Sequence, residues 1–235
     1  MKTANSQFEQ ALAGIFKNSP EGLKEFVCAP ASKRLRPKLI FATLQVLDLP
    51  ITPGQMKVAL AIEILHNATL IHDDIIDESV ERRGVVSFYK KYGAKKSVIL
   101  GDYLLSIAMK LVAQIGNAKV LEIFSDNMLK ICEGELATPS PKNYIEKITK
   151  KTALLFVCGV SSALELADTD VKTRQNLENF ALNYGIAFQI KDDIDDNENI
   201  HGSMKKEFTE RAKSDIKFLE QGKKRLLTAF LDDLE

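Results

Sequence analysis

Two stretches of this sequence end in the same acidic motif, Asp-Asp-x-x-Asp, and each motif follows an apolar segment with helical periodicity. The first stretch is residues 56–84 (MKVALAIEILHNATLIHDDIIDESVERRG), and the second is residues 179–196 (NFALNYGIAFQIKDDIDD). Residues three and four apart are neighbours on an α-helix, so the carboxylates of each motif share one side of a helix end. The first helix is apolar nearly all round, which predicts that it is buried. We therefore expect a fold organised around two buried helices with acidic C-terminal ends.

Carboxylates placed so closely at a helix C-terminus repel one another and also oppose the helix dipole. A single motif of this kind can be a solvated helix end, which is how we interpret Asp232-Asp233. Two matched copies favour cation binding instead, because clustered carboxylate oxygens suit Mg²⁺, which keeps several waters and bridges carboxylates to phosphates. We expect the two acidic ends to face each other across a cavity that holds metal ions and a polyphosphate. The candidate metal ligands are Asp73, Asp74, Asp77, Asp192, Asp193 and Asp196.

Composition limits the other possibilities. The chain has 235 residues, 45% of them hydrophobic, which is enough for a single domain over residues 1–235. Because 32 acidic residues balance 32 basic ones, no global field attracts nucleic acid or an anionic membrane. The N-terminus lacks an apolar signal core, and the longest mostly apolar run (153–164) is too short to span a bilayer. Three cysteines without CxxC spacing indicate reduced thiols, so we expect a soluble, cytoplasmic protein.

Nearly every segment has the helical period, and we find no convincing alternating strand, which predicts an all-α helical bundle. Residues 52–55 (TPGQ) are typical of a helix start, with Thr as the cap and Pro at the first position. The expected helices are one or two within 5–28, then 37–47, 53–77, 95–116, 118–136, 141–167, 171–196 and 204–234, with 85–93 a short helix or loop and 197–203 a loop.

Basic residues occur where a metal-bound phosphate would need them. Residues 32–37 (SKRLRP) place three cations just before a helix start, where free N–H groups also favour anions. Arg82 and Arg83 follow the first acidic motif, and residues 150–152 (KKT) precede an apolar run. Each group has an ordinary alternative: a solvated basic turn, a salt bridge to Glu78 or Glu81, or a surface lysine pair.

The three histidines are His66, His72 and His201. His66 lies seven residues before Asp73 on a similar face of the helix, and it is either a satisfied core residue or part of an anion site. His72 adjoins the first acidic motif. Metal phosphohydrolases need several histidine ligands, so this chain does not favour that class.

The acidic motifs and the basic segments together resemble those of the trans-isoprenyl diphosphate synthases (polyprenyl synthetases) of medium or long product length. The matching segments occur in the family's order over about residues 30–196: SKRLRP (32–37), HNATLIHDDIIDESVERRG (66–84), GDYLL (101–105), EGEL (133–136), KTALLF (151–156) and GIAFQIKDDIDD (185–196). The resemblance implies a single-domain helical bundle around a deep apolar cavity (the isoprenoid synthase fold), usually as a homodimer. It also implies Mg²⁺-dependent head-to-tail condensation of isopentenyl diphosphate with an allylic diphosphate, with three Mg²⁺ ions when substrate is bound.

The resemblance assigns roles by position. The six aspartates named above would bind the Mg²⁺ ions that hold the allylic diphosphate, beside the cations Arg82, Lys151 and, as a further candidate, Lys191. The residues that would hold isopentenyl diphosphate are Lys33, Arg36, His66 and Arg83. Two polar residues, Thr152 and Gln189, would line the reacting region. The predicted catalytic residues are Asp73, Asp74, Arg82, Lys151 and Asp192, and no side chain is assigned as a general base.

Product length is expected to depend on cavity depth behind Asp73. A large aromatic residue one turn back would close the pocket after a short chain, whereas this sequence has Ala68 there. We therefore predict a product of geranylgeranyl length or longer. The predicted chain-length pocket is formed by Ala68, Thr69 and Leu65.

The chain departs from the family's pattern in three places. Ser32 replaces the usual Gly before Lys33, the Gln-containing stretch after EGEL is absent near 138–141, and the loop at 197–206 is short, with only Lys205 and Lys206 in place of Gly-Lys pairs. We interpret the two short loops as segments missing from the sequence, because active-site loops are mobile and variable. The alternative is a naturally trimmed member.

Two other functions stay open. A terpene cyclase of the same fold typically carries an Asn/Ser/Glu metal motif on the second helix, where this chain has DDIDD, and it would have no use for Lys33, Arg36 and His66. An inactive regulatory subunit of a heteromeric synthase is favoured by the short loops and opposed by the two intact acidic motifs.

Overall fold

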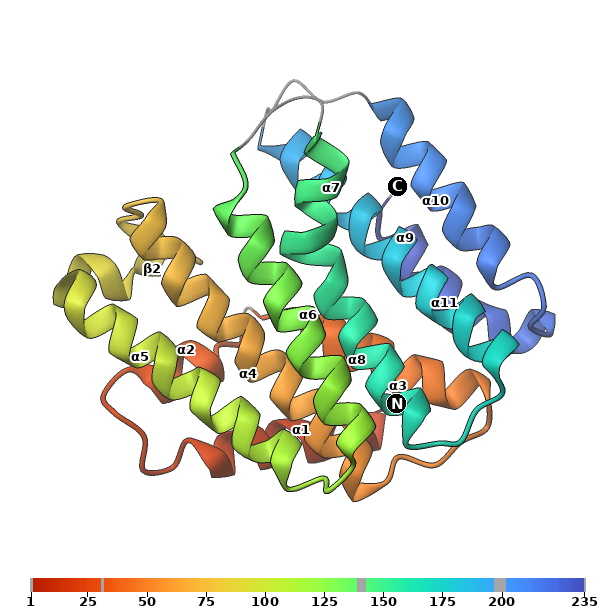
Figure 1. The fold of residues 1–235 in the computed structure, drawn as a ribbon, viewed down its shortest axis with the longest axis horizontal. Helices are drawn as coiled ribbons and strands as arrows, with labels where there is room; N and C mark the ends of the chain where they lie inside the picture. Colours follow the sequence, from red (N-terminus) through yellow and green to blue (C-terminus); the bar gives the residue numbers. More distant parts are fainter. Residues whose placement is uncertain (1, 31, 139–142, 197–201, 235) are drawn as a thin grey trace. The chain divides into compact units, whose positions relative to one another are not determined.

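The structure is a computed structural model that describes residues 2–30, 32–138, 143–196 and 202–234 of the chain. Figure 1 shows helices throughout these ranges and one small two-stranded sheet, so the prediction of an all-α fold is confirmed. The elements are α1 (Lys2–Ile15), α2 (Leu23–Val27), α3 (Leu35–Val46), α4 (Pro53–Ile76), β1 (Glu81–Arg82), β2 (Val85–Val86), α5 (Phe88–Ala113), α6 (Ala118–Leu136), α7 (Tyr144–Ile148), the π-helix η2 (Thr149–Ala153), α8 (Leu154–Glu165), α9 (Val171–Asp195), α10 (Gly202–Asp215) and α11 (Gln221–Asp232).

Contacts within the chain group it into two compact units. Unit 1 contains residues 1–37 and 56–116, and unit 2 contains residues 38–55 and 117–235. Unit 1 thus carries the first acidic motif, and unit 2 carries the second. The expectations of a single domain and of two acidic ends facing each other stay predictions.

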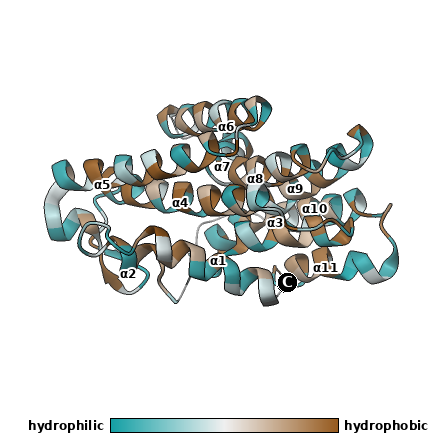
Figure 2. Ribbon diagram, turned by 90° about the horizontal axis from the view of Figure 1, so that it is seen from below, coloured by the Kyte–Doolittle hydropathy of each residue, from teal (hydrophilic) through white to brown (hydrophobic). Residues whose placement is uncertain are grey.

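In unit 2, α9 packs against α8 and α10, and α6 packs against α8 (Figure 1). Tyr184 of α9 is buried at the centre of an aromatic cluster, with edge-to-face contacts to Phe156 of α8 (5.2 Å between ring centroids) and Phe230 of α11 (5.6 Å). Hydrophobic and hydrophilic residues alternate along α6 in Figure 2, as expected of a helix with one packed face.

The helix start predicted at residues 52–55 is confirmed. Gln55 N–H donates to Thr52 Oγ1 (3.3 Å), and Thr52 N–H donates to Gln55 Oε1 (2.9 Å), which is the reciprocal pattern of a capping box. Helix α4 begins at Pro53 and ends at Ile76, one residue before the predicted end.

The sequence prediction missed a β-hairpin directly after the first acidic motif. Strands β1 and β2 pair antiparallel, with Arg82 opposite Val85. The turn residues Arg83 (φ 55°) and Gly84 (φ 79°) both lie in the left-handed region, as in the turns that favour two-residue hairpins. Residues 85 and 86 are therefore strand, and α5 begins at Phe88. The backbone of Gly93 (φ 75°, ψ 166°) interrupts α5, so a short helical segment precedes the long one, which begins close to the predicted residue 95.

The single helix predicted over 204–234 is wrong. It is broken into α10 and α11, and Glu220 has an extended backbone (ψ 148°) where α11 begins. The break lets α11 fold back along α10, because Lys205 Nζ donates to Leu234 O (2.7 Å), and it buries Leu227, Phe230 and Leu231. Burying these apolar side chains outweighs the helical turn that is lost at the break.

Among the described residues, no helix combines the length and apolarity needed to cross a bilayer. Cys28, Cys132 and Cys158 are free thiols. The cytoplasmic location stays a prediction.

Candidate active site

The first acidic motif presents three aspartates in three different environments within unit 1. Asp73 is half-buried, Asp74 is fully buried (0% exposed) and Asp77 is exposed just beyond the end of α4. Arg82 donates from Nε to Asp74 Oδ1 (2.8 Å), and its Nη2 forms an ion pair with the same oxygen (2.6 Å). A buried carboxylate needs such a partner, because desolvation without one costs several kcal/mol, on the order of 3–5.

The second oxygen of Asp74, Oδ2, is a candidate ligand for a cation. Asp74 Oδ2 is buried, and no hydrogen-bond donor among the described residues reaches it. A buried acceptor without a donor costs about 1–3 kcal/mol, and that cost falls if a cation binds there. The motif therefore fits a divalent ion that takes one oxygen of Asp74 while Arg82 keeps the other.

The hairpin explains why Arg82 reaches the motif. The reversal at Arg83-Gly84 holds β1 beside β2, and the hydroxyl of Ser87 donates to Ser79 O while also capping α5 at Lys90 N–H. The chain thus returns immediately after α4, and Arg82 lies beside the helix end that it follows. The alternative salt bridge from Arg82 to Glu78 or Glu81 is not what the structure has.

The three cations of the basic segment 32–37 lie in different environments. Lys33 is exposed and Arg36 is half-buried, while Arg34 is buried and bonds to Glu63 (2.7 Å) and to Glu9 of α1 (3.0 Å). Arg34 adopts a left-handed backbone (φ 53°). Its ion pair with the buried Glu63 holds this segment against α4, so Arg34 is a structural cation. The binding roles of Lys33 and Arg36 stay predictions.

Sequence analysis missed Glu63, although the sequence contained a signal. Glu63 is an acidic residue inside the apolar run ALAIEIL, and it is 1% exposed. A buried carboxylate needs a cationic partner, so Glu63 alone indicates that one of the basic residues is buried beside it. Ser32, the residue that departs from the family's Gly, joins this network: its hydroxyl is within 3.3 Å of Glu63 Oε1 and accepts from Arg34 Nη1 (3.2 Å).

His66 is half-buried, and its pKa lies well below the ordinary value. The largest cause is desolvation by burial, and the positive charges of Arg36, Arg83, Arg34 and Arg82 lower the pKa further. The ring is therefore neutral at pH 7. Because four guanidinium groups act on one ring, segments 32–37 and 82–83 form one cationic region in unit 1.

His72 has a packing role beside the acidic motif. A Cβ on Gly101 of α5 would lie 2.2 Å from His72 Nε2, so α5 approaches the ring closely enough to require glycine. His72 Nε2 also lies 3.5 Å from Asp102 Oδ1. The GDYLL segment thus fixes the ring next to Asp73.

The predicted chain-length residues precede the acidic motif on α4. Leu65 and Ala68 are buried, and Thr69 is half-buried with its hydroxyl bonded to His66 O (2.8 Å). Their role in product length stays a prediction.

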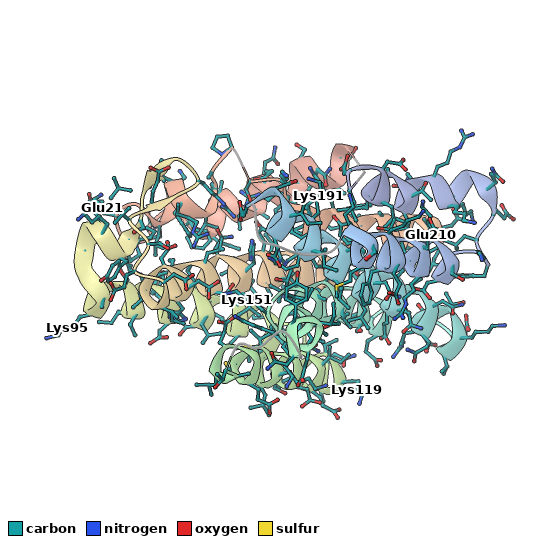
Figure 3. All side chains as sticks on the ribbon, turned by 90° about the horizontal axis from the view of Figure 1, so that it is seen from above. Glu21, Lys95, Lys119, Lys151, Lys191 and Glu210 are labelled. Atoms are coloured by element: carbon teal, nitrogen blue, oxygen red, sulfur yellow. The ribbon has the colours of Figure 1, made fainter. Side chains whose placement is uncertain are left out.

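In unit 2, the second acidic motif ends α9. Asp192 and Asp193 are half-buried and Asp196 is exposed. Lys191 Nζ pairs with Asp195 Oδ2 (2.5 Å), so its charge is directed along its own helix. Figure 3 labels Lys191 on α9 and Lys151 on η2. Residues 139–142 and 197–201, which include His201 and most of both short loops, lie outside the described residues.

Lys151 and Thr152 lie on the π-helix η2, a wide turn that occurs frequently at functional sites. Two glycines let neighbouring helices approach this turn: a Cβ on Gly185 of α9 would lie 2.7 Å from Ala153 Cα, and one on Gly134 of α6 would lie 2.5 Å from Lys150 Cβ. Lys151 Nζ is 3.4 Å from Glu135 Oε1. The KTALLF, EGEL and GIAFQ segments therefore meet at one place.

A chain of hydrogen bonds runs from η2 to the second motif. Thr152 Oγ1 donates to Gln189 Oε1 (2.5 Å), and Gln189 Nε2 donates to Asp193 Oδ1 (2.7 Å). Tyr144 of α7, which the sequence analysis did not select, donates its hydroxyl to Asp193 Oδ2 (2.6 Å). The structure thus brings together Thr152, Gln189 and Asp193 as neighbours within unit 2.

Within the described parts of the chain, no three His, Cys, Asp or Glu side chains gather closely enough to enclose a metal ion. Mg²⁺ does not need such a cage, because it usually keeps several waters and binds through one or two carboxylates together with substrate phosphates. The metal assignments of the six aspartates stay predictions.

Comparison with known proteins identifies the family. The polyprenyl synthetase family model matches residues 21–218. A prenyl transferase of Cyanidium caldarium is 34% identical over 199 residues, which are 79% of this chain and 62% of that protein. A decaprenyl-diphosphate synthase of Dictyostelium discoideum is 35% identical over 168 residues, which are 69% of this chain and 37% of that protein. The chain therefore spans less than two thirds of the length of either relative.

A solved structure shows the same fold. The polyprenyl synthase of Caulobacter crescentus, in complex with calcium and isoprenyl diphosphate, superposes with a TM-score of 0.83 at 22% identity, covering 99% of this chain and 94% of that chain. The fold resemblance and the family match agree, since the matched residues include both acidic motifs, the hairpin and the π-helix. This chain belongs to the polyprenyl synthetase family.

Proposed function

We propose that the protein is a prenyltransferase that condenses isopentenyl diphosphate head-to-tail with an allylic diphosphate, to give an all-trans polyprenyl diphosphate. The observation that carries this proposal is the family match over residues 21–218, which includes two complete acidic motifs and the basic segments. The prenyl transferase and decaprenyl-diphosphate synthase relatives support it by their activities.

We further propose three Mg²⁺ ions with substrate bound, held by Asp73, Asp74 and Asp77 of the first motif and Asp192, Asp193 and Asp196 of the second. The buried, donorless Oδ2 of Asp74 supports this assignment. When bound, Mg²⁺ would stabilise the negative charge that develops on the leaving diphosphate. The calcium and isoprenyl diphosphate in the Caulobacter crescentus structure are consistent with a divalent ion in this fold.

The chain's own residues then have separate tasks. Lys151 and Arg82 stabilise the leaving diphosphate as the allylic C–O bond breaks and the diphosphate takes the electron pair. Lys33, Arg36 and Arg83, with the neutral ring of His66, hold isopentenyl diphosphate by its charged end. Apolar side chains exclude water that would quench the allylic cation. The isopentenyl double bond forms the new C–C bond, and the proton that is lost passes to the departed diphosphate.

The test is incorporation of radiolabelled isopentenyl diphosphate by the purified protein alone, with Mg²⁺ and a series of allylic primers. We expect label in polyprenyl diphosphates and none after chelation of Mg²⁺. A terpene cyclase would consume the allylic substrate without incorporating label. A regulatory subunit would be inactive alone and would elute with a partner chain on size-exclusion chromatography, whereas we propose a homodimer.

Product length tests the predicted pocket at Ala68. We propose a product of geranylgeranyl length or longer, in line with the decaprenyl relative. Ala68→Phe would place a ring at this buried position, so we expect the main product to become shorter while condensation continues. Ala118→Phe, the same substitution at an exposed position at the start of α6, is the matched control. An unchanged product distribution in Ala68→Phe would exclude Ala68 from the pocket.

A further inference from the structure

The two acidic motifs differ in how the protein holds their second aspartate. In the first motif, a charged guanidinium from the hairpin covers one oxygen of Asp74. In the second motif, both oxygens of Asp193 accept hydrogen bonds from neutral groups, Oδ1 from the Gln189 amide (2.7 Å) and Oδ2 from the Tyr144 hydroxyl (2.6 Å). Tyr144 lies outside both motifs and outside the segments that the family resemblance singles out.

The direction of these hydrogen bonds is fixed by chemistry. An ionised carboxylate only accepts, so Tyr144 must donate its proton and Gln189 must turn its NH₂ group toward Asp193. The amide oxygen of Gln189 then faces Thr152, whose hydroxyl must donate. Three side chains from three elements are therefore oriented by one carboxylate, and they orient that carboxylate in return.

The backbone connects the two ends of this network. Tyr144 begins α7, and α7 continues through Ile148 directly into η2, which carries Thr152. Ile148 is buried, and Gly185 and Gly134 let α9 and α6 approach η2 closely. The continuous stretch 144–153 therefore contacts α9 twice: Tyr144 bonds to Asp193, and Thr152 bonds to Gln189.

We propose that Tyr144 is a positioning residue for the second acidic motif. Its hydroxyl holds Asp193 in one orientation before a metal–diphosphate complex binds, so that the carboxylate does not have to be ordered on binding. Rotation of the Asp193 carboxylate would break both of its hydrogen bonds at once. Hydrogen bonds to an ionised carboxylate are stronger than neutral ones, so this orientation is well defined. The inference rests on the proposed synthase function and concerns residues within unit 2 only.

The test is Tyr144→Phe, which removes a single oxygen atom. Isothermal titration calorimetry with inorganic pyrophosphate at several Mg²⁺ concentrations measures the affinity directly, without turnover. We expect the apparent dissociation constant of Mg²⁺–pyrophosphate to rise about tenfold, the size expected for losing one hydrogen bond to a charged group. Tyr103→Phe, on an exposed residue of α5, makes the same chemical change and should leave the affinity unchanged.

A second readout separates positioning from a general loss of structure. In steady-state assays, Tyr144→Phe should raise the Mg²⁺ concentration needed for half-maximal rate and leave the KM for isopentenyl diphosphate unchanged. If Tyr144→Phe folds poorly by circular dichroism, Gln189→Met, which removes the other donor to Asp193, should raise the same dissociation constant. Wild-type affinity in a folded Tyr144→Phe or Gln189→Met variant overturns the inference alone. A wild-type protein that neither binds Mg²⁺–pyrophosphate nor incorporates label overturns the proposed function, and this inference with it.

Discussion

Asp74 is fully buried, and the guanidinium of Arg82 lies against one of its two oxygens, with Nε donating a hydrogen bond to Oδ1 and Nη2 at ion-pair distance from it. The guanidinium is planar and always charged, which suits such a buried partner better than an ammonium group. The second oxygen of Asp74 is buried and accepts no hydrogen bond from the described residues.

Arg82→Lys should therefore be harmful although it conserves charge. We expect the free energy of unfolding to fall by about 1–3 kcal/mol, because Lys has no counterpart of the Nε–H group that bonds to the buried carboxylate. The rate of condensation should fall by at least about tenfold for the same geometric reason. Thermal denaturation and initial rates at saturating Mg²⁺ measure the two effects.

The matched control is Arg211→Lys, which alters an exposed pair with Glu207 on α10. Its effect on stability should stay within about 0.5 kcal/mol, as is usual for surface pairs. Equal effects of the two substitutions would show that the Arg82–Asp74 contact has no special role.

His66 gives a prediction about pH. Its folded-state pKa is lowered, first by desolvation and then by the surrounding arginines, whereas its unfolded pKa is about 6.5. The unfolded state therefore binds more protons than the folded state just below pH 6.5, so stability falls as pH falls through that value toward the folded pKa. Above pH 6.5 both states are neutral at this ring, and His66 gives no pH dependence.

Urea unfolding of wild-type protein and His66→Gln between pH 5 and 7.5 tests this. The difference in unfolding free energy between the two proteins should be constant above about pH 7 and should shift in favour of the variant as the pH is lowered, since Gln cannot take up a proton. A difference that stays constant over the whole range would mean that the folded-state pKa of His66 is not lowered.

At the residue scale, several residues that the family resemblance names lie next to each other in the structure: Asp74 with Arg82, and Thr152 with Gln189 and Asp193. The resemblance named these residues one by one, and their contacts with each other were not predicted. Arg34, Glu63 and Tyr144 were missed as partners because their contacts join residues 25 to 49 positions apart. Periodicity carries no information about such pairs.

At the scale of elements, glycines set how closely the helices approach the site. Gly185 lies where a Cβ would be 2.7 Å from the backbone of η2, and Ala153 has no flexible end that could move aside. Helices packed this closely have no free space for an added methyl group, so such a group must displace a neighbouring helix.

Gly185→Ala should therefore destabilise the protein by about 1–3 kcal/mol, the usual cost of overpacking. It should also weaken Mg²⁺–pyrophosphate binding, because α9 carries both Gln189 and the second motif. Gly14→Ala on α1 is the control: nothing lies within 4 Å of its added Cβ, so it should be neutral or stabilise by up to about 1 kcal/mol. A Gly185→Ala variant as stable as Gly14→Ala would contradict the packing that we describe.

Most helices could be predicted from their period, and the start of α4 from its capping box. The hairpin at 81–86 could not, because each strand has only two residues and its turn is Arg-Gly instead of the more typical Asn-Gly. The break between α10 and α11 could not either, since the sequence there has no proline and its apolar period hardly changes. The break is stabilised by the burial of Leu227 and Leu231 against other helices, and the local sequence gives no sign of that packing.

At the scale of the whole molecule, the chain carries two acidic motifs. The first motif lies in unit 1 and the second in unit 2, and we propose that both act on the same metal-bound diphosphate. Duplication of the motif, membership of the family and the donorless oxygen of Asp74 all support this claim.

Calorimetric titration with pyrophosphate, with and without Mg²⁺, is the most direct measurement, applied to wild-type protein, Asp73→Asn and Asp192→Asn. The account predicts a single Mg²⁺-dependent pyrophosphate site per chain, weakened by at least about tenfold by either substitution, since each removes a charge from the same site. Retention of the wild-type affinity by either variant would contradict it. So would a second Mg²⁺-dependent site in the wild-type protein, with each substitution abolishing only one of the two.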